Sequence, residues 1–274
     1  MMKTIGMIVP TMDNSFFASL AHAVAEEMRK NGYTVLTCDS HNDAETEKGF
    51  YATLKEAGVS GVISVSGLSQ VTEETIPADL PLVWVDRVPE SEREIPWVAN
   101  DDEAAMKEAA KYLIAKGCRN ILLMPGYIAE NQNNPRLEGY KKALAEAGIE
   151  FNPDYVLNRT GKGSSEQETG ELIMKVMKDG RRADGIITSS DRAAFGAMKA
   201  LGKVGFYSPE DVRLISFDNS PYSTMASPSI TSLDRNPASL AGRACEILLD
   251  LAAGKEVQKE NVISVSLVER DSTR

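Results

Sequence analysis

Short apolar segments alternate with longer amphipathic segments along the chain, and the same alternation occurs in each half. Residues 4–10 and 120–125 are apolar runs, each followed by a polar loop and a helical pattern. Residues 60–66 and 183–189 repeat the likeness one helix later in each half. A strand-loop-helix unit can bury its apolar strand only against neighbouring units. The pattern therefore predicts two similar halves, each built on a parallel sheet.

The periodicity assigns most of the chain to strands and helices. Strands are expected where β-branched or apolar runs occur, at residues 5–10, 34–38, 61–65, 82–85, 121–124, 185–188, 213–217 and 262–268. Helical patterns cover residues 15–31, 45–57, 102–116, 135–147, 166–179, 192–203 and 237–253. Several helices end at a glycine suited to a left-handed cap, namely Gly32, Gly58, Gly117, Gly148, Gly202 and Gly254. This alternation is typical of an α/β fold with two doubly wound parallel-sheet lobes.

Three stretches without periodicity suggest where the chain passes between the lobes. Residues 86–100 and 220–232 are loop-like, and residues 264–274 form the final strand and tail. We expect an N-terminal lobe of residues 1–99 plus 236–265 and a C-terminal lobe of residues 100–235 plus 266–274. Three crossings make a hinge of three strands. Parallel sheets bind ligands at the carboxyl ends of their strands, so two facing sheets predict a ligand cleft between the lobes.

Composition narrows the possible partners. The formal net charge is -10 and the sequence pI is about 4.9, which argues against these residues gripping a nucleic-acid backbone by themselves. No apolar run reaches the roughly 18 residues that a membrane span needs, so no membrane partner is expected. The start of the chain lacks the apolar stretch of a signal peptide. The three cysteines Cys38, Cys118 and Cys245 are widely spaced, which favours reduced, mostly buried thiols and a cytoplasmic location.

Several segments resemble the effector domain of the lactose-repressor (LacI/GalR) family. The opening segment reads IGMIVPTMDNSFFASLAHAVAEEMRKNGYTVLTC, and later segments read LVWVDR, RLEGYKKAL, SSDRAAFGAMKAL and PEDVRLISFDN. The closing signature is SPSITSLDRNPASLAGRACEILL followed by SLVERDST. Each motif is weak by itself, whereas their order and spacing together are specific. The likeness covers essentially the whole chain and implies a fold of the periplasmic binding protein type I class.

The resemblance implies a function. The chain would be the effector-binding and dimerisation core of a transcriptional regulator, with a sugar or sugar derivative held between its lobes. Family members contact operator DNA through a small helix-turn-helix headpiece. We expect that headpiece to be absent from this chain, either because the chain is a piece of a longer protein or because the homologue lacks it. The implied assembly is a homodimer.

Two other classes of protein remain open at this point. A solute-binding protein of a sugar transporter shares the fold and is the near alternative. An α/β enzyme would need a catalytic constellation, and no residue stands out as catalytic; no GxSxG nucleophile elbow occurs. His22 and His41 are the two histidines and lack the spacing of a metal site, so neither a metal nor a cofactor is expected.

The candidate ligand contacts of the first lobe follow its strands. Asn14, Phe16 and Phe17 come after the first strand and open the first helix, where an amide can fix a hydroxyl and an aromatic ring can cover the apolar face of a sugar. The alternative is a helix cap beside core aromatics. Asp86 and Arg87 follow another strand and offer an acceptor and a planar five-donor group, with a local surface ion pair as the alternative.

The candidate contacts of the second lobe are Arg136, Ser190, Asp218 and Arg235. Arg136 begins a helix, where the helix dipole opposes a cation, and the resemblance places a ligand-binding arginine there. Asp218 follows a strand and either accepts from two hydroxyls or turns its own backbone. Ser190 and Arg235 depart from the family's usual Asn and Gln, and the segment between Gly163 and Gly170 lacks an aromatic found in many relatives. These departures leave an anionic ligand open, and they leave Arg235 open as a hinge ion pair.

Overall fold

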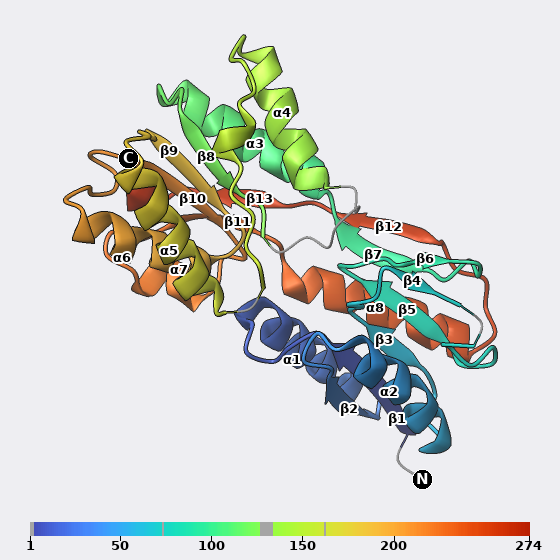
Figure 1. Ribbon diagram of the computed structural model, residues 1–274. Coiled ribbons are helices and arrows are strands. Elements are labelled where there is room, and N and C mark those ends of the chain that lie inside the picture. The colour runs from blue at the N-terminus through green and yellow to red at the C-terminus, as the bar shows by residue number, and fades with distance from the viewer. Residues whose placement is uncertain (1–2, 73, 127–133, 162) are drawn as a thin grey trace. The chain divides into compact units, whose positions relative to one another are not determined.

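The computed structural model of the 274-residue chain describes residues 3–72, 74–126, 134–161 and 163–274 (Figure 1). The chain divides into two compact units, and each contains one central sheet with helices on both faces. Unit 1 consists of Met1–Asn100 and Asn236–Ile263, and unit 2 consists of Asp101–Arg235 and Ser264–Arg274. Each unit is therefore assembled from segments that are distant in the sequence.

The sheet of unit 1 has the strand order β12-β7-β5-β3-β1-β2, and all its strands are parallel. Its strands are β1 (Lys3–Val9), β2 (Tyr33–Asp39), β3 (Val62–Ser64), β5 (Leu82–Val85), β7 (Trp97–Asn100) and β12 (Glu260–Ile263). Two short strands, β4 (Gln70–Val71) and β6 (Glu90–Ser91), pair with each other outside this sheet. Because all six strands run in one direction, their carboxyl ends meet at one edge.

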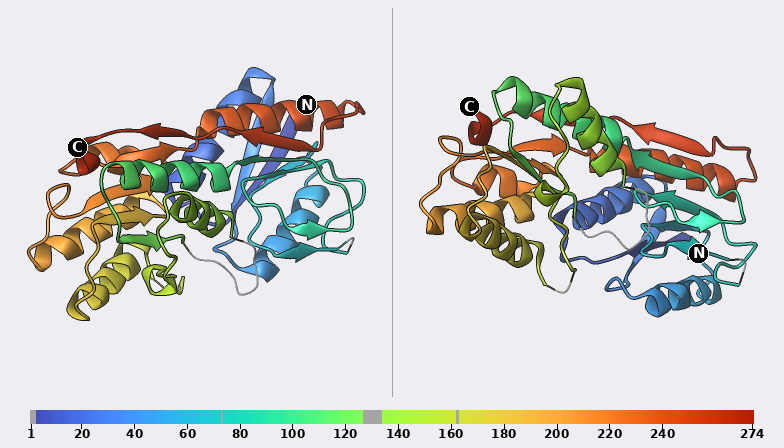
Figure 2. Two further views of the ribbon diagram at one scale, coloured as in Figure 1. Left: turned by 90° about the horizontal axis from the view of Figure 1, so that it is seen from above. Right: turned by 45° about the horizontal axis from the view of Figure 1, so that its top comes forward.

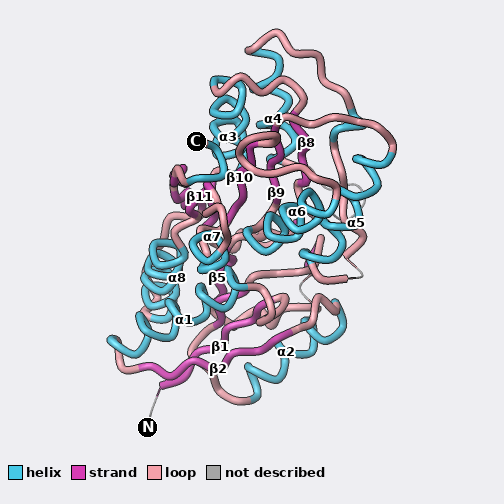
Figure 3. The backbone as a smooth tube through the Cα atoms, turned by 90° about the vertical axis from the view of Figure 1, so that its left-hand side faces the viewer, coloured by secondary structure: helices cyan, strands magenta, loops and turns pink. Residues whose placement is uncertain are grey.

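Helices cover both faces of this sheet because successive strand residues point to opposite sides. Helices α1 (Ser15–Lys30) and α8 (Pro237–Ala252) lie side by side (Figure 3). They pack in one core cluster with Ile5, Met7 and Val9 of β1. Helix α2 (Ala44–Glu56) packs on the opposite face, in the cluster that contains Ile8 and Trp84. The uninterrupted apolar strands of the sequence are thus buried on both sides, as expected of a parallel sheet.

Unit 2 repeats the arrangement with the strand order β13-β11-β10-β9-β8. Its strands are β8 (Ile121–Met124), β9 (Gly185–Thr188), β10 (Arg213–Phe217), β11 (Thr231–Asp234) and β13 (Ser266–Val268). The first four are parallel, and β13 is antiparallel at the edge of the sheet. Helices α3 (Asp102–Ala115) and α4 (Pro135–Glu146) cover one face, and α5 (Ser165–Lys178) and α6 (Asp191–Lys203) cover the other (Figure 2).

Short elements complete unit 2. Helix α7 (Pro221–Met225) follows β10, and two single-turn helices span Pro153–Tyr155 and Asp271–Thr273. Glycines allow the two helix pairs of this unit to approach closely. A Cβ on Gly139 would lie 2.2 Å from the carbonyl oxygen of Glu103, and one on Gly196 would lie 2.1 Å from that of Glu166. The backbones of α3 and α4, and of α5 and α6, therefore meet at positions where only glycine fits.

Three expectations from the sequence are wrong. The apolar run at residues 262–268 is two strands, because β12 ends unit 1 at Ile263 and β13 joins the sheet of unit 2. Strand β7 and the first two residues of β11 lie in stretches expected to be irregular, because polar residues and prolines surround them. Helix α6 ends at Lys203 as expected, but Gly202 lies inside it and is not its left-handed cap; the left-handed glycine after it is Gly205, with φ 79°.

Candidate ligand-binding site

The carboxyl edge of the unit 1 sheet carries Asn14 at the start of helix α1. Its Oδ1 accepts hydrogen bonds from the backbone N–H groups of Phe16, at 2.8 Å, and Phe17, at 3.5 Å. Both rings belong to the unit's apolar core, with 2% and 4% of their surface exposed, and they meet edge-on at 5.6 Å between centroids. The cap and the core packing fix the start of α1, and the aromatic rings thereby become a rigid part of this edge.

Asp86 and Arg87 follow strand β5 at the same edge. Asp86 has φ 69°, in the left-handed region, and its N–H donates to the carbonyl oxygen of Val98 at 2.9 Å. Arg87 is an exposed residue, and its guanidinium lies 5.3 Å from the centroid of the Phe17 ring. A cation over an aromatic face is attracted to it electrostatically. The contact places Arg87 beside the predicted residues of helix α1.

Glu47, a buried carboxylate of helix α2 that the sequence did not single out, stabilises the loop after strand β3 at this edge. The Glu47 side chain of α2 accepts from the Ser66 hydroxyl at 2.5 Å and from the Gly67 N–H at 2.8 Å. The Glu47 carboxylate also accepts from the Tyr51 hydroxyl at 3.2 Å. The Tyr51 hydroxyl in turn lies 2.9 Å from the Ser64 hydroxyl, within hydrogen-bond distance. Burial, followed by the Glu47 charge, raises the pKa of Tyr51 well above its ordinary value. This network ties α2 to the end of β3.

In unit 2, Arg136 is held by groups from three other elements. Its Nε donates to Asp102 Oδ2 at 2.8 Å, and its Nη1 donates to the Ser189 carbonyl oxygen at 3.4 Å. Its guanidinium carbon lies 4.0 Å from the centroid of the Phe217 ring. Asp102 opens α3, where the helix dipole favours an anion, and it compensates a cation that the dipole of α4 opposes.

Burial opposes ionisation of Asp102, but the charges of Arg136 and then Arg235 overcome it and hold the pKa of Asp102 below its ordinary value. The second oxygen of this carboxylate, Oδ1, is buried and has no hydrogen-bond partner among the residues that the structure describes. The Ser189 hydroxyl is also buried and also has no hydrogen-bond partner among the described residues. Buried polar atoms are normally paired, so two such atoms on residues that contact one guanidinium indicate a place for a polar ligand group.

Asp218 and Arg235 form a second pair of charges at this edge. Asp218 follows β10 with φ 102°, and its N–H donates to the Leu233 carbonyl oxygen at 2.9 Å. The Arg235 guanidinium lies 3.7 Å from the Asp218 carboxylate, and both side chains are almost fully buried. This ion pair lies inside unit 2. Like Asp86 in unit 1, Asp218 is an aspartate with positive φ directly after a central strand, and such backbone strain often occurs at functional positions.

Ser190 acts as the N-cap of α6, where its hydroxyl accepts from the Ala193 N–H at 3.2 Å. The next residue, Asp191, is fully buried and organises the surrounding loops. It accepts from the hydroxyls of Ser216 and Ser232, the latter at 2.7 Å, and from the Ser220 N–H at 2.5 Å. Burial raises the pKa of Asp191, and these hydrogen bonds partly oppose the rise. Asp191 thus fixes the strands that carry Asp218 and Arg235.

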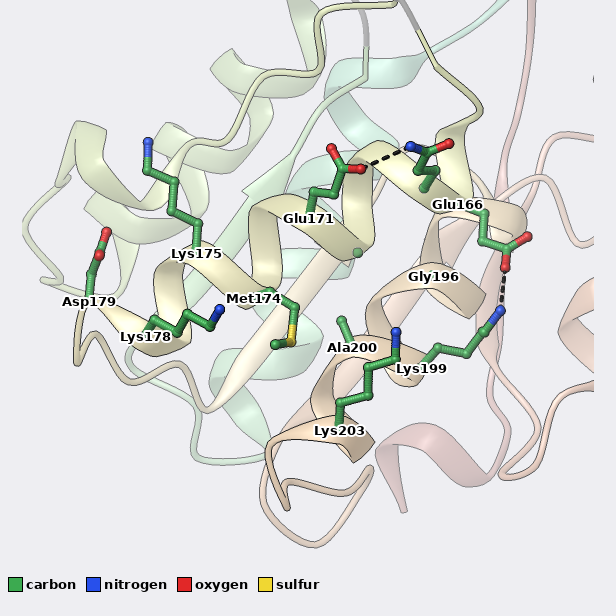
Figure 4. A pocket seen from close by; sticks show the side chains of 12 residues that line it. Glu166, Glu171, Met174, Lys175, Lys178, Asp179, Gly196, Lys199, Ala200 and Lys203 are labelled. Atoms are coloured by element: carbon green, nitrogen blue, oxygen red, sulfur yellow. Dashed lines mark hydrogen bonds and ion pairs between the residues drawn. The ribbon is translucent and has the colours of Figure 1, made fainter.

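A separate cavity of about 700 Å³ lies between α5 and α6. Four lysines and the side chain of Met174 are among its lining groups, and Lys199 donates to Glu166 at 2.7 Å (Figure 4). None of the predicted ligand contacts lines this cavity. Its walls are long, exposed side chains on helix surfaces, so we assign the ligand site to the strand ends instead.

In unit 2 the structure brings together Arg136, Asp218 and Arg235. Ser190 directly follows Ser189, whose carbonyl oxygen accepts from Arg136. Asp102, Ser189, Asp191 and Glu47 are additions that the sequence did not single out. Asp102 could have been noticed as a second aspartate at a helix start, but its position beside Arg136 depends on how α3 packs on α4. Within the described ranges, no group of three or more His, Cys, Asp or Glu side chains could hold a metal ion.

The described helices include none that is both long and apolar enough to cross a membrane. The three cysteines are unpaired, and Cys118 and Cys245 are buried.

Two α/β units with parallel sheets, each carrying polar and charged groups at its strand ends, define a ligand-binding protein with the type I fold of the periplasmic binding proteins.

Comparison with known proteins gives the family. Residues 2–269 match the family model described as periplasmic binding proteins and sugar binding domain of LacI family. The repressor PurR of Pasteurella multocida is 30% identical over 254 residues, which cover 90% of this chain and 74% of the relative. The ribose operon repressor of Halalkalibacterium halodurans is 28% identical, covering 98% of this chain and 79% of the relative. The chain therefore belongs to this family.

Solved structures agree with this assignment. The transcription regulator CcpA of Lactococcus lactis superposes with a TM-score of 0.88 at 28% identity, and each chain is covered completely. A LacI-type regulator of Alkaliphilus metalliredigens complexed with D-xylulofuranose gives a TM-score of 0.87 at 29% identity, with 99% of each chain covered. A LacI family regulator of Enterococcus faecium with bound ribose gives 0.85 at 25% identity, with 99% and 98% covered. Of the classes that the sequence left open, the relatives support a regulator's effector-binding domain over a transporter's binding protein.

Proposed function

We propose that the chain is the sensor of a LacI-type repressor, and that binding of a sugar or sugar derivative changes the regulator's affinity for operator DNA. The observation that carries the proposal is the cluster of Arg136, Asp218 and Arg235 at the strand ends of unit 2, in a chain of this family. The named relatives are repressors, and two of the neighbouring structures hold a sugar. Enzymatic activity is not part of the proposal.

The chemistry of the cluster suits a ligand rich in hydroxyl groups. Each hydroxyl offers one donor and two acceptor lone pairs, so it needs carboxylates and guanidinium groups together. Asp218 supplies the acceptor, Arg136 and Arg235 supply donors, and the Phe217 ring lies under the Arg136 guanidinium. In unit 1 we propose Asn14, Phe16, Phe17, Asp86 and Arg87 as ligand contacts, and in unit 2 also Ser190.

The two compact units are proposed to be the two lobes of the sensor. A ligand that binds one of two conformations more tightly shifts the population toward that conformation. The affinity for DNA can change only as far as the ligand's affinities for the two conformations differ. A coupling of about 1–3 kcal/mol is typical of such regulators. The net charge of -10 indicates that DNA contacts are made by other residues of the regulator. We place the protein in the cytoplasm, in keeping with its unpaired cysteines.

A thermal-shift screen of sugars followed by calorimetry tests this function. A ligand at 100 times its Kd stabilises the fold by about 2.7 kcal/mol, which such a screen detects. The decisive variant is Asp218→Asn, because asparagine tolerates the positive φ better than alanine. With almost no change in volume, it removes the charge and replaces one carboxylate acceptor by an amide donor. We expect it to weaken binding of the best sugar at least tenfold while the circular dichroism spectrum stays unchanged.

The matched control is Asp179→Asn, which removes a charge at an exposed position that lines the α5–α6 cavity. It should leave the Kd unchanged. A loss of affinity in Asp179→Asn, with Asp218→Asn unaffected, would move the site to that cavity and contradict the assignment.

The proposed assembly is a homodimer. The apolar residues Val24 and Met28 of helix α1 cannot face a partner, because both are fully buried in the unit 1 core. Better support comes from α7, where Met225 is 81% exposed and Tyr222 is 39% exposed. Light scattering at micromolar concentration should give twice the chain mass of 29.8 kDa. A mass equal to that of one chain would refute the dimer.

A further inference from the structure

The charged groups of unit 2 that lie at the strand ends compensate one another. Arg136 is paired with Asp102 at 2.8 Å, and the side chains are only 14% and 20% exposed. Arg235 lies 3.7 Å from Asp218, and these side chains are 6% and 4% exposed. Two guanidinium groups and two carboxylates sum to no net charge. An excess of positive charge that would favour an anionic ligand is therefore absent from these four groups.

The partial burial of these groups makes that balance matter for ligand binding. Charge interactions are several times stronger in a partly buried environment than in bulk water. A phosphate or carboxylate beside Arg136 would also be repelled by the carboxylate of Asp102, which already neutralises the arginine. Burial of an ion without a counter-charge is strongly unfavourable, so an anionic group is disfavoured here. An uncharged ligand avoids this cost.

The hydrogen-bond inventory points the same way. Asp102 Oδ1 is buried with no partner in the described part of the chain, and an ionised carboxylate oxygen can only accept. A sugar hydroxyl can donate to it. A fully ionised phosphate or carboxylate group has acceptors only and would leave Oδ1 unpaired. The unfilled acceptor beside Arg136 thus calls for a ligand group with a hydrogen to donate.

We propose that Asp102 sets the charge selectivity of the effector site: it holds the Arg136 guanidinium, neutralises it, and so admits uncharged polyhydroxylated effectors while rejecting their phosphorylated or carboxylated forms. The inference rests on the proposed function, since it concerns the same site. It extends that function by assigning selectivity to a residue outside the predicted contacts. Asp102 is a positioning residue for Arg136, and its negative charge is the selective element.

The variant Asp102→Asn inverts the relevant properties with almost no change in volume. Arg136 Nε donates to Oδ2, so the amide oxygen takes that position and the amide NH₂ replaces Oδ1. A donor then stands where an acceptor stood, and one negative charge is gone. The matched control is Asp101→Asn, the same change one residue earlier. Asp101 caps α3 by accepting from the Ala104 N–H at 2.9 Å, and asparagine is an equally good cap.

The experiment is calorimetry with sugars and their phosphate esters as matched pairs: D-ribose with ribose 5-phosphate, D-xylulose with its 5-phosphate, and D-glucose with its 6-phosphate. We expect the wild-type protein to bind a neutral member at least tenfold more tightly than its ester. In Asp102→Asn, the ratio of the two Kd values should shift toward the ester by tenfold or more, equivalent to about 1.4 kcal/mol. In Asp101→Asn the ratio should equal that of the wild type.

Three results would overturn the inference. The first is wild-type protein that binds an ester as tightly as its sugar, a comparison that needs no variant. The second is an unchanged ratio in a folded Asp102→Asn protein. The third is an equal shift in Asp101→Asn, which would mean that any charge at this helix start has the effect. Failure of the wild-type protein to bind either member of every pair would instead contradict the proposed function itself.

Discussion

Removal of the Asp191 carboxylate should destabilise unit 2. The variant Asp191→Ala withdraws the acceptor used by two serine hydroxyls and by the backbone N–H of Ser220. The hydroxyls of Ser216 and Ser232 can rotate toward other acceptors, whereas the N–H of Ser220 is fixed. A buried donor left unsatisfied costs about 1–3 kcal/mol. With a smaller loss for the hydroxyls, we expect the free energy of unfolding to fall by about 2–4 kcal/mol.

The variant Asp191→Asn separates the acceptor from the charge. Its amide oxygen still accepts, so the loss should be smaller than in Asp191→Ala. Because burial raises the pKa of Asp191, the protonated form stabilises the fold at low pH, and this contribution is lost as pH rises through the raised pKa. The stability of the wild type relative to Asp191→Asn should therefore decrease as pH rises above about 4.

Urea denaturation followed by circular dichroism measures these changes. The corresponding buried carboxylate of unit 1, Glu47, provides a parallel variant, Glu47→Ala. Both tryptophans of the chain, Trp84 and Trp97, lie in unit 1, and Trp84 packs edge-on against Tyr51 at 6.3 Å. Tryptophan fluorescence should therefore report the loss of Glu47. A stability of Asp191→Ala within about 0.5 kcal/mol of the wild type, the usual range for a surface change, would refute the role of this network.

Three further outcomes are expected. Gly196→Ala should destabilise the protein by about 1–3 kcal/mol in urea, because its Cβ would meet the Glu166 carbonyl oxygen, whereas Gly202→Ala on the same helix has open space and should stabilise by about 0.5–1 kcal/mol; equal effects would contradict the packing of α5 on α6. Because the pKa of Asp102 is lowered, its contribution to stability is present above the ordinary pKa and is lost as pH falls through the lowered value. Melting temperatures measured between pH 2.5 and 5 should therefore depend less on pH in Asp102→Asn than in the wild type. Arg87→Ala should weaken sugar binding without changing the urea midpoint, because Arg87 is an exposed residue; a shifted midpoint would make it a structural residue.

The sequence predicted the elements of the fold well because the strands of parallel sheets are continuous apolar runs and the helices between them carry clear caps. Gly32, Gly58, Gly117, Gly148 and Gly254 all have positive φ, as expected of left-handed caps. The prediction missed β7 and the start of β11, because polar residues and prolines surround them in stretches that resemble loops. It also failed at residues 262–268, where one apolar run continues while the chain changes sheets.

The candidate site could be predicted only in part. Residues at the carboxyl ends of strands, such as Asp86 and Asp218, follow from the topology of any parallel sheet. The partner of Arg136 could not be predicted, because Asp102 is 34 positions away and reaches it through helix packing. The same holds for Asp191, whose three partners come from two strands and a loop. Charge balance at a site depends on such pairings, and the sequence alone does not give them.

A crystal structure of the protein with the sugar that ranks first in the thermal-shift screen tests the central claim most directly. The account predicts ligand hydroxyls within hydrogen-bond distance of the Asp218 carboxylate and the Arg136 guanidinium, with one hydroxyl donating to Asp102 Oδ1. A sugar bound elsewhere, for example in the cavity between α5 and α6, with the Asp218 and Arg136 side chains untouched, would contradict it.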